Sequence, residues 1–210
     1  MQRLEPLVAE GSWPAILVRF RIGFVFGMSD RTGELRLSNR ADLDETKGTW
    51  KVMHPKGEDT YGDKGAELDI FTNTRPFVVD FLEAMERRLR ALGLDPAKVE
   101  PLCPHENGEH YTEGGWRGQR DKVFHRIGVQ PNDDERALRR NHGKHVVEAL
   151  QAKGHKEGSI IELGSKRLRN GMQTFQNFYA DLMTIKARKV IADAYESFST
   201  SGKKGGLDSA

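Results

Sequence analysis

The sequence predicts an α+β protein in which an N-terminal antiparallel sheet packs on one helix and a helical C-terminal region follows. Two observations support this prediction. Apolar and polar residues alternate in short segments near the N-terminus, and apolar residues recur at helical spacing from residue 74 onward. The chain has 210 residues, of which 37% are hydrophobic and 30% charged, which is sufficient for one sizeable core or two smaller ones.

Four segments of the N-terminal region are predicted as strands. In residues 15–26 the apolar side chains at even positions alternate with arginine and glycine. A turn pattern at residues 30–33 leads into a second alternating segment at 34–38, so these two strands are expected to form a hairpin. Weaker strand patterns follow at 49–53 and 66–71, with a loop rich in glycine and charge between them.

A helix is predicted to begin after Thr74 and to cover one face of this sheet. Thr74 is a suitable N-cap, Pro76 falls in the first turn, and Gly93 is placed to end the helix. Apolar residues between Pro76 and Gly93 recur at spacings of three and four. Residues 95–130, which are rich in proline and glycine, are predicted to be irregular.

The C-terminal region is predicted to contain helices at 134–153, 159–169 and 171–198. The expected organisation is a strand-rich lobe at 1–94, an irregular linker at 95–131, a basic helical lobe at 132–198 and a flexible tail at 199–210.

Charge is distributed unevenly between the two ends of the chain. Through Gly115 there are 15 basic and 20 acidic residues, and from Trp116 onward there are 18 basic and 11 acidic residues. A net charge of +2 therefore combines a balance of −5 with a balance of +7. This asymmetry indicates either a polyanionic partner or copies of the chain that dock an acidic face against a basic face.

The single cysteine, Cys103, excludes an internal disulfide and is typical of a protein in a reducing compartment. The N-terminal residues lack the pattern of a signal peptide, and the most apolar stretch is too short to span a bilayer. We therefore expect a cytoplasmic protein without a membrane partner.

The candidate nucleic-acid-binding residues are basic side chains of the predicted C-terminal helices, spaced to match phosphates along a nucleic-acid backbone. They are Arg136, Arg139, Arg140, Lys144, Lys166, Arg167 and Arg169. An equally acceptable interpretation is a solvated helix surface or a face that binds a partner protein.

Two further patterns point to metal chemistry. Cys103, His105 and His110, with His125 downstream, carry the thiolate and imidazole ligands that zinc prefers, although the usual paired C-x2-C half is missing. Glu67 and Asp69 lie on a predicted strand, as acids that hold magnesium in nucleases often do, but they also fit a half-exposed strand.

No complete set of catalytic residues is present in a known motif. The sequence has no phosphate-binding GxxxxGK[ST] loop, no G-x-S-x-G nucleophile and no H-E-x-x-H zinc motif. The preferred hypothesis is a non-catalytic subunit of a larger assembly that binds the phosphate backbone of DNA or RNA. The alternatives are an assembly or scaffold protein that uses charge-complementary lobes, including as a homo-oligomer, and a zinc- or magnesium-dependent hydrolase or nuclease.

Overall fold

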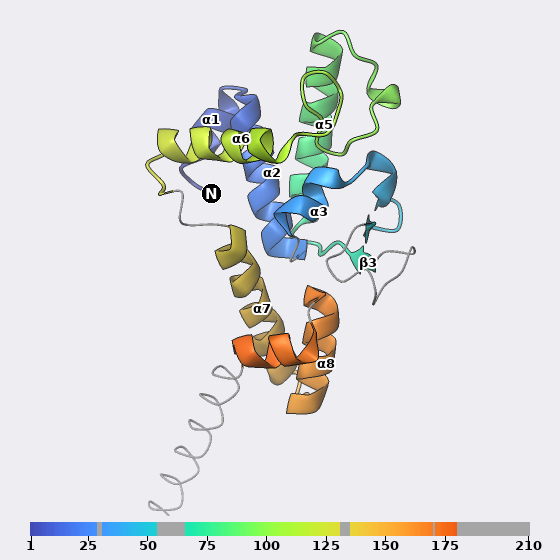
Figure 1. Ribbon diagram of the computed structural model, residues 1–210, viewed down its shortest axis with the longest axis vertical. Coiled ribbons are helices and arrows are strands. Elements are labelled where there is room, and N and C mark those ends of the chain that lie inside the picture. The colour runs from blue at the N-terminus through green and yellow to red at the C-terminus, as the bar shows by residue number, and fades with distance from the viewer. Residues whose placement is uncertain (29–30, 54–65, 131–134, 170, 180–210) are drawn as a thin grey trace, which may run out of the picture. The chain divides into compact units, whose positions relative to one another are not determined.

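The computed structural model describes residues 1–28, 31–53, 66–130, 135–169 and 171–179 (Figure 1). The chain divides into two compact units, which are described separately below. The first unit comprises Met1–His142 together with Arg167–Arg169, and the second comprises Gly143–Lys166 together with residues 170–210.

The first unit contains a small antiparallel sheet among helices, so the predicted α+β class is confirmed. Its elements are α1 (Glu5–Ala9), α2 (Trp13–Met28), α3 (Thr32–Leu37), the 3-10 turn η1 (Arg40–Asp42), β1 (Leu43–Asp44), β2 (Thr49–Val52), β3 (Ala66–Asp69), α5 (Arg75–Ala91), the 3-10 turn η3 (Pro96–Lys98) and α6 (Glu113–Arg126). Helix α7 (Glu135–Ala152) begins in the first unit and continues in the second, and α8 (Glu157–Leu168) belongs to the second unit up to Lys166.

The three strands lie in the order β1-β2-β3, and each pair is antiparallel. Trp50 is paired with Leu68, and both side chains are buried, whereas the paired Lys51 and Glu67 are exposed. This alternation is the one expected of a sheet with one covered face. The strands predicted at 49–53 and 66–71 are therefore confirmed.

Helix α5 is also confirmed at the predicted position. Pro76 lies in the first turn, where its missing N–H removes no helical hydrogen bond, and Gly93 follows the last turn with φ of +76°. The buried residues of α5 recur at helical spacing on one face and are Val78, Phe81, Leu82, Met85 and Leu89.

The predicted strand at 15–26 is wrong, because this segment forms helix α2. Its buried residues face two different clusters: Phe20 and Phe24 pack in the main core, whereas Val18 packs with Val123 and Phe124 of α6. A helix that is covered on more than one side has apolar residues all round, so spacing alone does not distinguish it from a strand. The predicted strand at 34–38 is wrong as well, because residues 32–37 form α3.

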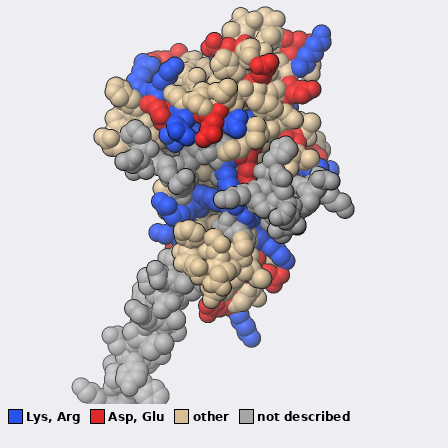
Figure 2. Space-filling model, viewed as in Figure 1, with Lys and Arg blue, Asp and Glu red and all other residues tan. Residues whose placement is uncertain are grey.

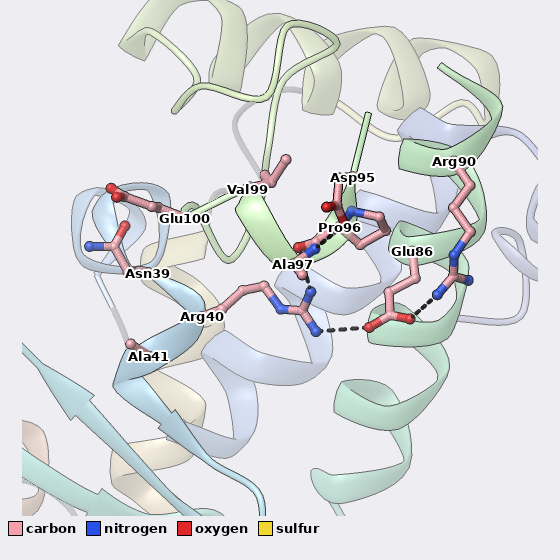
Figure 3. Close-up of a pocket in the computed structure, with 10 residues that line it drawn as sticks. All are labelled: Asn39, Arg40, Ala41, Glu86, Arg90, Asp95, Pro96, Ala97, Val99 and Glu100. Carbon is pink, nitrogen blue, oxygen red and sulfur yellow. Dashed lines mark hydrogen bonds and ion pairs between the residues drawn. The ribbon is translucent and has the colours of Figure 1, made fainter. Parts of the chain in front are cut away.

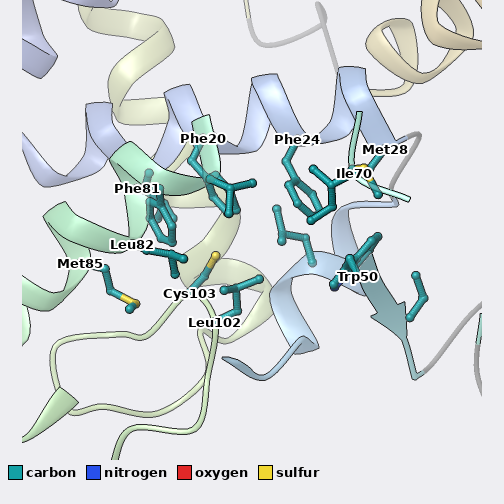
Figure 4. Packing of buried hydrophobic residues seen from close by; sticks show 14 of the residues in the cluster. Phe20, Phe24, Met28, Trp50, Ile70, Phe81, Leu82, Met85, Leu102 and Cys103 are labelled. Carbon is teal, nitrogen blue, oxygen red and sulfur yellow. The ribbon is translucent and has the colours of Figure 1, made fainter. Parts of the chain in front are cut away.

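The main core joins α2, α5 and β2 through stacked aromatic rings (Figure 4). Phe20 and Phe81 stack with ring centroids 4.0 Å apart, and the edge of Trp50 meets Phe24 at a centroid distance of 4.9 Å. Cys103 is fully buried in the same core. The sheet therefore packs on both α2 and α5.

The segment predicted as irregular at 95–130 contains one long helix, α6. Thr112 caps it by accepting a hydrogen bond from the backbone N–H of Gly115 at 3.1 Å. The buried Arg21 of α2 places its guanidinium 4.0 Å from the ring centroid of Trp116 and donates to the Trp116 carbonyl at 2.7 Å. Several of the glycines that indicated a loop lie within the helix and at its N-terminal turn.

The predicted helices at 134–153 and 159–169 correspond to α7 and α8. The helix predicted at 171–198 is observed over residues 172–179, and the remainder lies outside the described residues. The ring of Phe175 packs against Gly164, and that of Tyr179 against Gly143. Within the described residues, no helix is both long and apolar enough to cross a membrane.

Candidate functional site: an arginine cluster around Glu34

The candidate site is built at the start of α3 in the first unit. Arg31 precedes the helix, and its backbone N–H donates to the carboxylate of Glu34 at 2.8 Å. The backbone N–H of Glu34 donates in turn to the Arg31 carbonyl at 2.8 Å, and the acid lies over the first turn, where the helix dipole favours a negative charge. The Arg31 guanidinium also donates to Glu34, with 2.8 Å between Nη1 and Oε1. The sequence of this turn thus fixes one arginine and one carboxylate side by side.

The second oxygen of Glu34 binds an arginine that is distant in sequence. Arg169 Nη2 lies 2.6 Å from Glu34 Oε2, and the side chains are 0% and 4% exposed, respectively. An ion pair taken this far out of water is maintained only when its geometry and further hydrogen bonds are good. Glu34 is consequently the anchor for a segment of three residues, Arg167–Arg169, which we call the 167–169 segment.

Further arginine contacts hold the 167–169 segment in place. Arg31 donates to the carbonyl of Arg169 at 2.9 Å, and Arg139 of α7 donates to the carbonyl of Leu168. Arg167 donates to the carbonyls of Asp69 and Gly27 at 3.2 and 3.1 Å. Four guanidinium groups therefore meet at this segment and at the carboxylate of Glu34.

The backbone of Arg169 adopts a left-handed conformation with φ of +51°. A side chain in this region costs roughly 1 kcal/mol or more, and such residues concentrate at functional sites. Here the conformation is held by the Glu34 ion pair and by the hydrogen bond from Arg31. The strained residue is therefore the same residue that completes the cluster.

Electrostatics within the cluster favour an additional negative charge. Burial opposes ionisation of Glu34, but Arg169 and Arg31 outweigh it and hold the pKa of this carboxyl below its usual range. Burial, together with the like charge of Arg169, lowers the pKa of Arg167 to about 10. Because guanidiniums repel each other here, an anion that reached the cluster would relieve that repulsion.

The basic residues that were predicted to form one exposed surface differ in their environments. Arg140 and Lys144 are both exposed on α7, and Lys166 of α8 forms an ion pair of 2.7 Å with Glu162. Only the backbone of Arg136 is described. The expectation of surface exposure is wrong for Arg169, because its side chain is fully buried against Glu34.

The side chain of Arg167 is also not solvated, as an exposed residue that contacts phosphate would be. Its guanidinium lies 4.0 Å from the ring centroid of Phe71, and two main-chain carbonyls accept its hydrogen bonds. This environment fixes the side chain against the first unit. Sequence spacing named Arg139, Arg167 and Arg169 as candidates, but it did not indicate that they converge on Arg31 and Glu34.

The predicted zinc ligands do not assemble. Cys103 is fully buried in the core, His105 packs edge-on to Tyr111 with ring centroids 5.0 Å apart, and His125 is exposed on α6. His110 pairs with Pro104 through a β-bridge that closes the loop. Among the described residues, no three His, Cys, Asp or Glu side chains come together in a way that could hold a metal ion.

The same finding applies to the predicted magnesium site, since Glu67 and Asp69 are part of no such group in the described ranges. Glu67 accepts a hydrogen bond from the hydroxyl of Thr49 at 2.9 Å, across the sheet. Both acids lie on the exposed face of β3. They are explained as surface residues of a half-covered strand.

A groove of about 740 Å³ lies between η1, the C-terminal end of α5 and η3 (Figure 3). Arg40 and Arg90 each bind one oxygen of Glu86, at 2.8 and 2.9 Å. The hydrogen bond from Arg40 lowers the pKa of the Glu86 carboxyl. Because both oxygens are engaged within the groove, we assign these ion pairs a structural role: the Arg40 pair joins η1 to α5, and the Arg90 pair lies within α5.

Basic residues on α6 are mixed with acids rather than concentrated. Arg117 pairs with Glu113 at 3.1 Å, and Arg120 pairs with Asp121 at 2.8 Å. Figure 2 shows this mixture over α6, where basic and acidic side chains lie next to one another. The exposed Arg117–Glu113 pair contributes little to stability, whereas the Arg120 side chain is only 15% exposed.

Comparison with known proteins gives a fold but not a family. No protein-family model matches the sequence, and no curated protein matches it. A solved structure described as the crystal structure of XerA recombinase matches with a TM-score of 0.59 and 14% sequence identity, over 90% of this chain and 60% of that chain. The chain is similar in fold to this recombinase. It spans less than two thirds of the recombinase chain, and at 14% identity the similarity concerns the fold alone.

Proposed function

We propose that this chain binds DNA and holds a backbone phosphate at the arginine cluster around Glu34. The observation that carries the proposal is the meeting of four guanidinium groups at the 167–169 segment. Guanidiniums bind phosphate through paired, charge-assisted hydrogen bonds, and they remain charged at any physiological pH. The similarity in fold to a recombinase favours DNA over other polyanions.

Arg31 is the best residue for testing this proposal, because its side chain is 25% exposed and it belongs to the cluster. Arg31→Gln is expected to weaken binding of a duplex oligonucleotide by about 10- to 100-fold at low salt, as expected for the loss of a charged hydrogen bond. The salt dependence should also fall, by about one unit of slope. A fluorescence-anisotropy titration at several salt concentrations, with DNA and RNA duplexes, measures both quantities.

Two further variants separate charge from fold. Arg31→Lys retains the charge and should recover part of the affinity, and Arg87→Gln is the matched control. Arg87 is exposed on α5, where it forms an ion pair of 3.7 Å with Glu83. Affinity that is equal in the wild type, Arg31→Gln and Arg87→Gln would contradict the proposal, provided that all three melt at similar temperatures.

A second candidate function is the cleavage and rejoining of DNA strands, favoured by the recombinase fold and by an arginine cluster suited to a phosphoryl-transfer transition state. In such a reaction a side-chain hydroxyl attacks phosphorus, and a deoxyribose hydroxyl leaves with the proton. The new phosphoester keeps one strand on the protein, so the reverse attack rejoins the strand. A phenol with a pKa of about 10 is a better leaving group than an alcohol, so a tyrosine suits this step.

The four tyrosines of the chain, Tyr61, Tyr111, Tyr179 and Tyr195, allow a complete test. Each tyrosine is replaced by phenylalanine in turn, and the variant that lacks the attacking tyrosine is expected to lose a covalent protein–DNA adduct formed on a nicked, labelled duplex and detected after denaturing electrophoresis. Tyr111 is poorly suited to this step, because burial raises the pKa of its phenol and its oxygen accepts a hydrogen bond from Trp13 at 3.1 Å. If the wild type forms no adduct, or all four Tyr→Phe variants retain it, the tyrosine mechanism is excluded.

A further inference from the structure

The donors of the arginine cluster are occupied by the protein's own main chain. Arg31 donates to the carbonyl of Arg169, and Arg139 donates to that of Leu168. Both acceptors are uncharged carbonyl oxygens of the 167–169 segment. A phosphate oxygen carries negative charge, so a guanidinium attracts it more strongly than it attracts an uncharged carbonyl oxygen. The carbonyls therefore hold positions at which a phosphate would be the stronger acceptor.

We propose that the 167–169 segment is an internal competitor for the phosphate, and that DNA gains the arginines of the cluster by displacing it. This inference rests on the proposed DNA binding and adds a regulatory step to the same site. In the closed state, Leu168 and Arg169 present carbonyls to Arg139 and Arg31. In the open state, the phosphodiester takes over these donors.

The segment is held closed by contacts that would not themselves touch the phosphate. Arg167 bonds to the carbonyls of Asp69 and Gly27 and lies over the ring of Phe71. The left-handed backbone of Arg169 stores strain that is released on opening. The closed state is therefore anchored at Arg167 and at the ion pair between Arg169 and Glu34, and it is strained at Arg169, which are properties of an element with two positions.

The direction in which Arg167→Gln changes the affinity for DNA tests this inference. If Arg167 anchors the competitor, Arg167→Gln should tighten binding of a 30-base-pair duplex at low salt, although it removes a positive charge. A closed population of about nine in ten would correspond to a gain of about tenfold. If Arg167 instead contacts phosphate, the same change weakens binding, and the inference is overturned.

Phe71→Leu provides a second variant without a change in charge. It removes the ring beneath Arg167, so it too should tighten binding, while Arg87→Gln on α5 should leave the affinity close to the wild-type value. Equal affinity of the wild type and Phe71→Leu would overturn the inference. Thermal unfolding of each variant confirms that the folded protein is being compared.

Hydrogen exchange distinguishes displacement of the 167–169 segment from a purely structural role of that segment. On addition of the duplex, backbone amides of the 167–169 segment should exchange faster while those of α3 become protected. Slower exchange in both regions would overturn the inference but leave DNA binding intact. If neither the wild type nor Arg167→Gln binds the duplex at low salt, the proposed function itself has failed, so the two failures are distinct.

Discussion

Replacing Glu34 with glutamine is expected to lower the free energy of unfolding by about 3–5 kcal/mol, the usual cost of removing one partner of a buried ion pair. The reason is that Arg169, whose side chain is 0% exposed, would keep its charge and lose the carboxylate that lies 2.6 Å away. Arg31 would lose its ion pair with the same group. Urea unfolding at neutral pH, followed by circular dichroism, measures the change.

Glu113→Gln is the matched control for this variant. Glu113 pairs with Arg117 at 3.1 Å on the surface of α6, and both side chains are more than half exposed. Removing that pair should change stability by no more than about 0.5 kcal/mol. If Glu34→Gln lowers the free energy of unfolding by less than about 1 kcal/mol, the effect is close to that of ordinary surface substitutions. That result would contradict the claim that the Glu34 carboxylate holds the arginine cluster together.

The pH dependence of the free energy of unfolding should show the contribution of the Glu34 carboxyl. Because the folded pKa of Glu34 is lowered, its contribution is fully present above the unfolded pKa of about 4.3. That contribution is lost as the pH falls through the folded pKa. The stability difference between the wild type and Glu34→Gln should therefore be largest above about pH 5 and should shrink in more acidic solution.

Local sequence patterns predicted the elements whose environment is simple. Helix α5 has one buried face and clear end signals at Pro76 and Gly93, and β2 and β3 alternate because the sheet is covered on one face. Helix α2 was not predictable in this way, since it contacts both α5 and α6. Its apolar residues at even positions also satisfy the spacing of four that a buried helix requires.

The site could be predicted only in part, because its decisive contacts are distant in sequence. Glu34 and Arg169 are separated by 135 positions, and no periodicity connects them. Basic residues at helical spacing indicated Arg139, Arg167 and Arg169, but the spacing did not show which of them are buried. Glu34 is an acid in the first turn of α3, which is the local signal that could have located this helix.

The role of a charged residue in this protein depends on whether its side chain is buried. The acids near β3 and the cationic side chains of α6 lie at the surface, where pairing is weak and water is an adequate solvent. The arginines around Glu34 are held by main-chain carbonyls and by the carboxylate of Glu34 rather than by water. On the proposed mechanism, a phosphate reaches Arg31 and Arg139 by replacing those carbonyls.

The second large effect is expected at Trp50, which supports the cluster from the core. Trp50 is fully buried against Phe24, and its Nε1 donates to the hydroxyl of Ser38 at 3.2 Å. That hydroxyl donates in turn to the carbonyl of Glu34 at 2.9 Å, so the indole is linked to the end of α3. Trp50→Ala should cost about 3–5 kcal/mol in the free energy of unfolding, since it leaves a large cavity in the main core.

Two smaller changes separate packing from the hydrogen-bond link. Trp50→Phe retains most of the ring and loses the N–H, and Ser38→Ala removes the hydroxyl alone, so the latter should cost about 1–3 kcal/mol. If the link positions α3, Ser38→Ala should also reduce the DNA affinity of the folded protein, although Ser38 is buried and unable to reach a phosphate. Unchanged affinity in Ser38→Ala, together with a full loss of stability in Trp50→Ala, would mean that Trp50 fills the core without positioning Arg31 and Glu34.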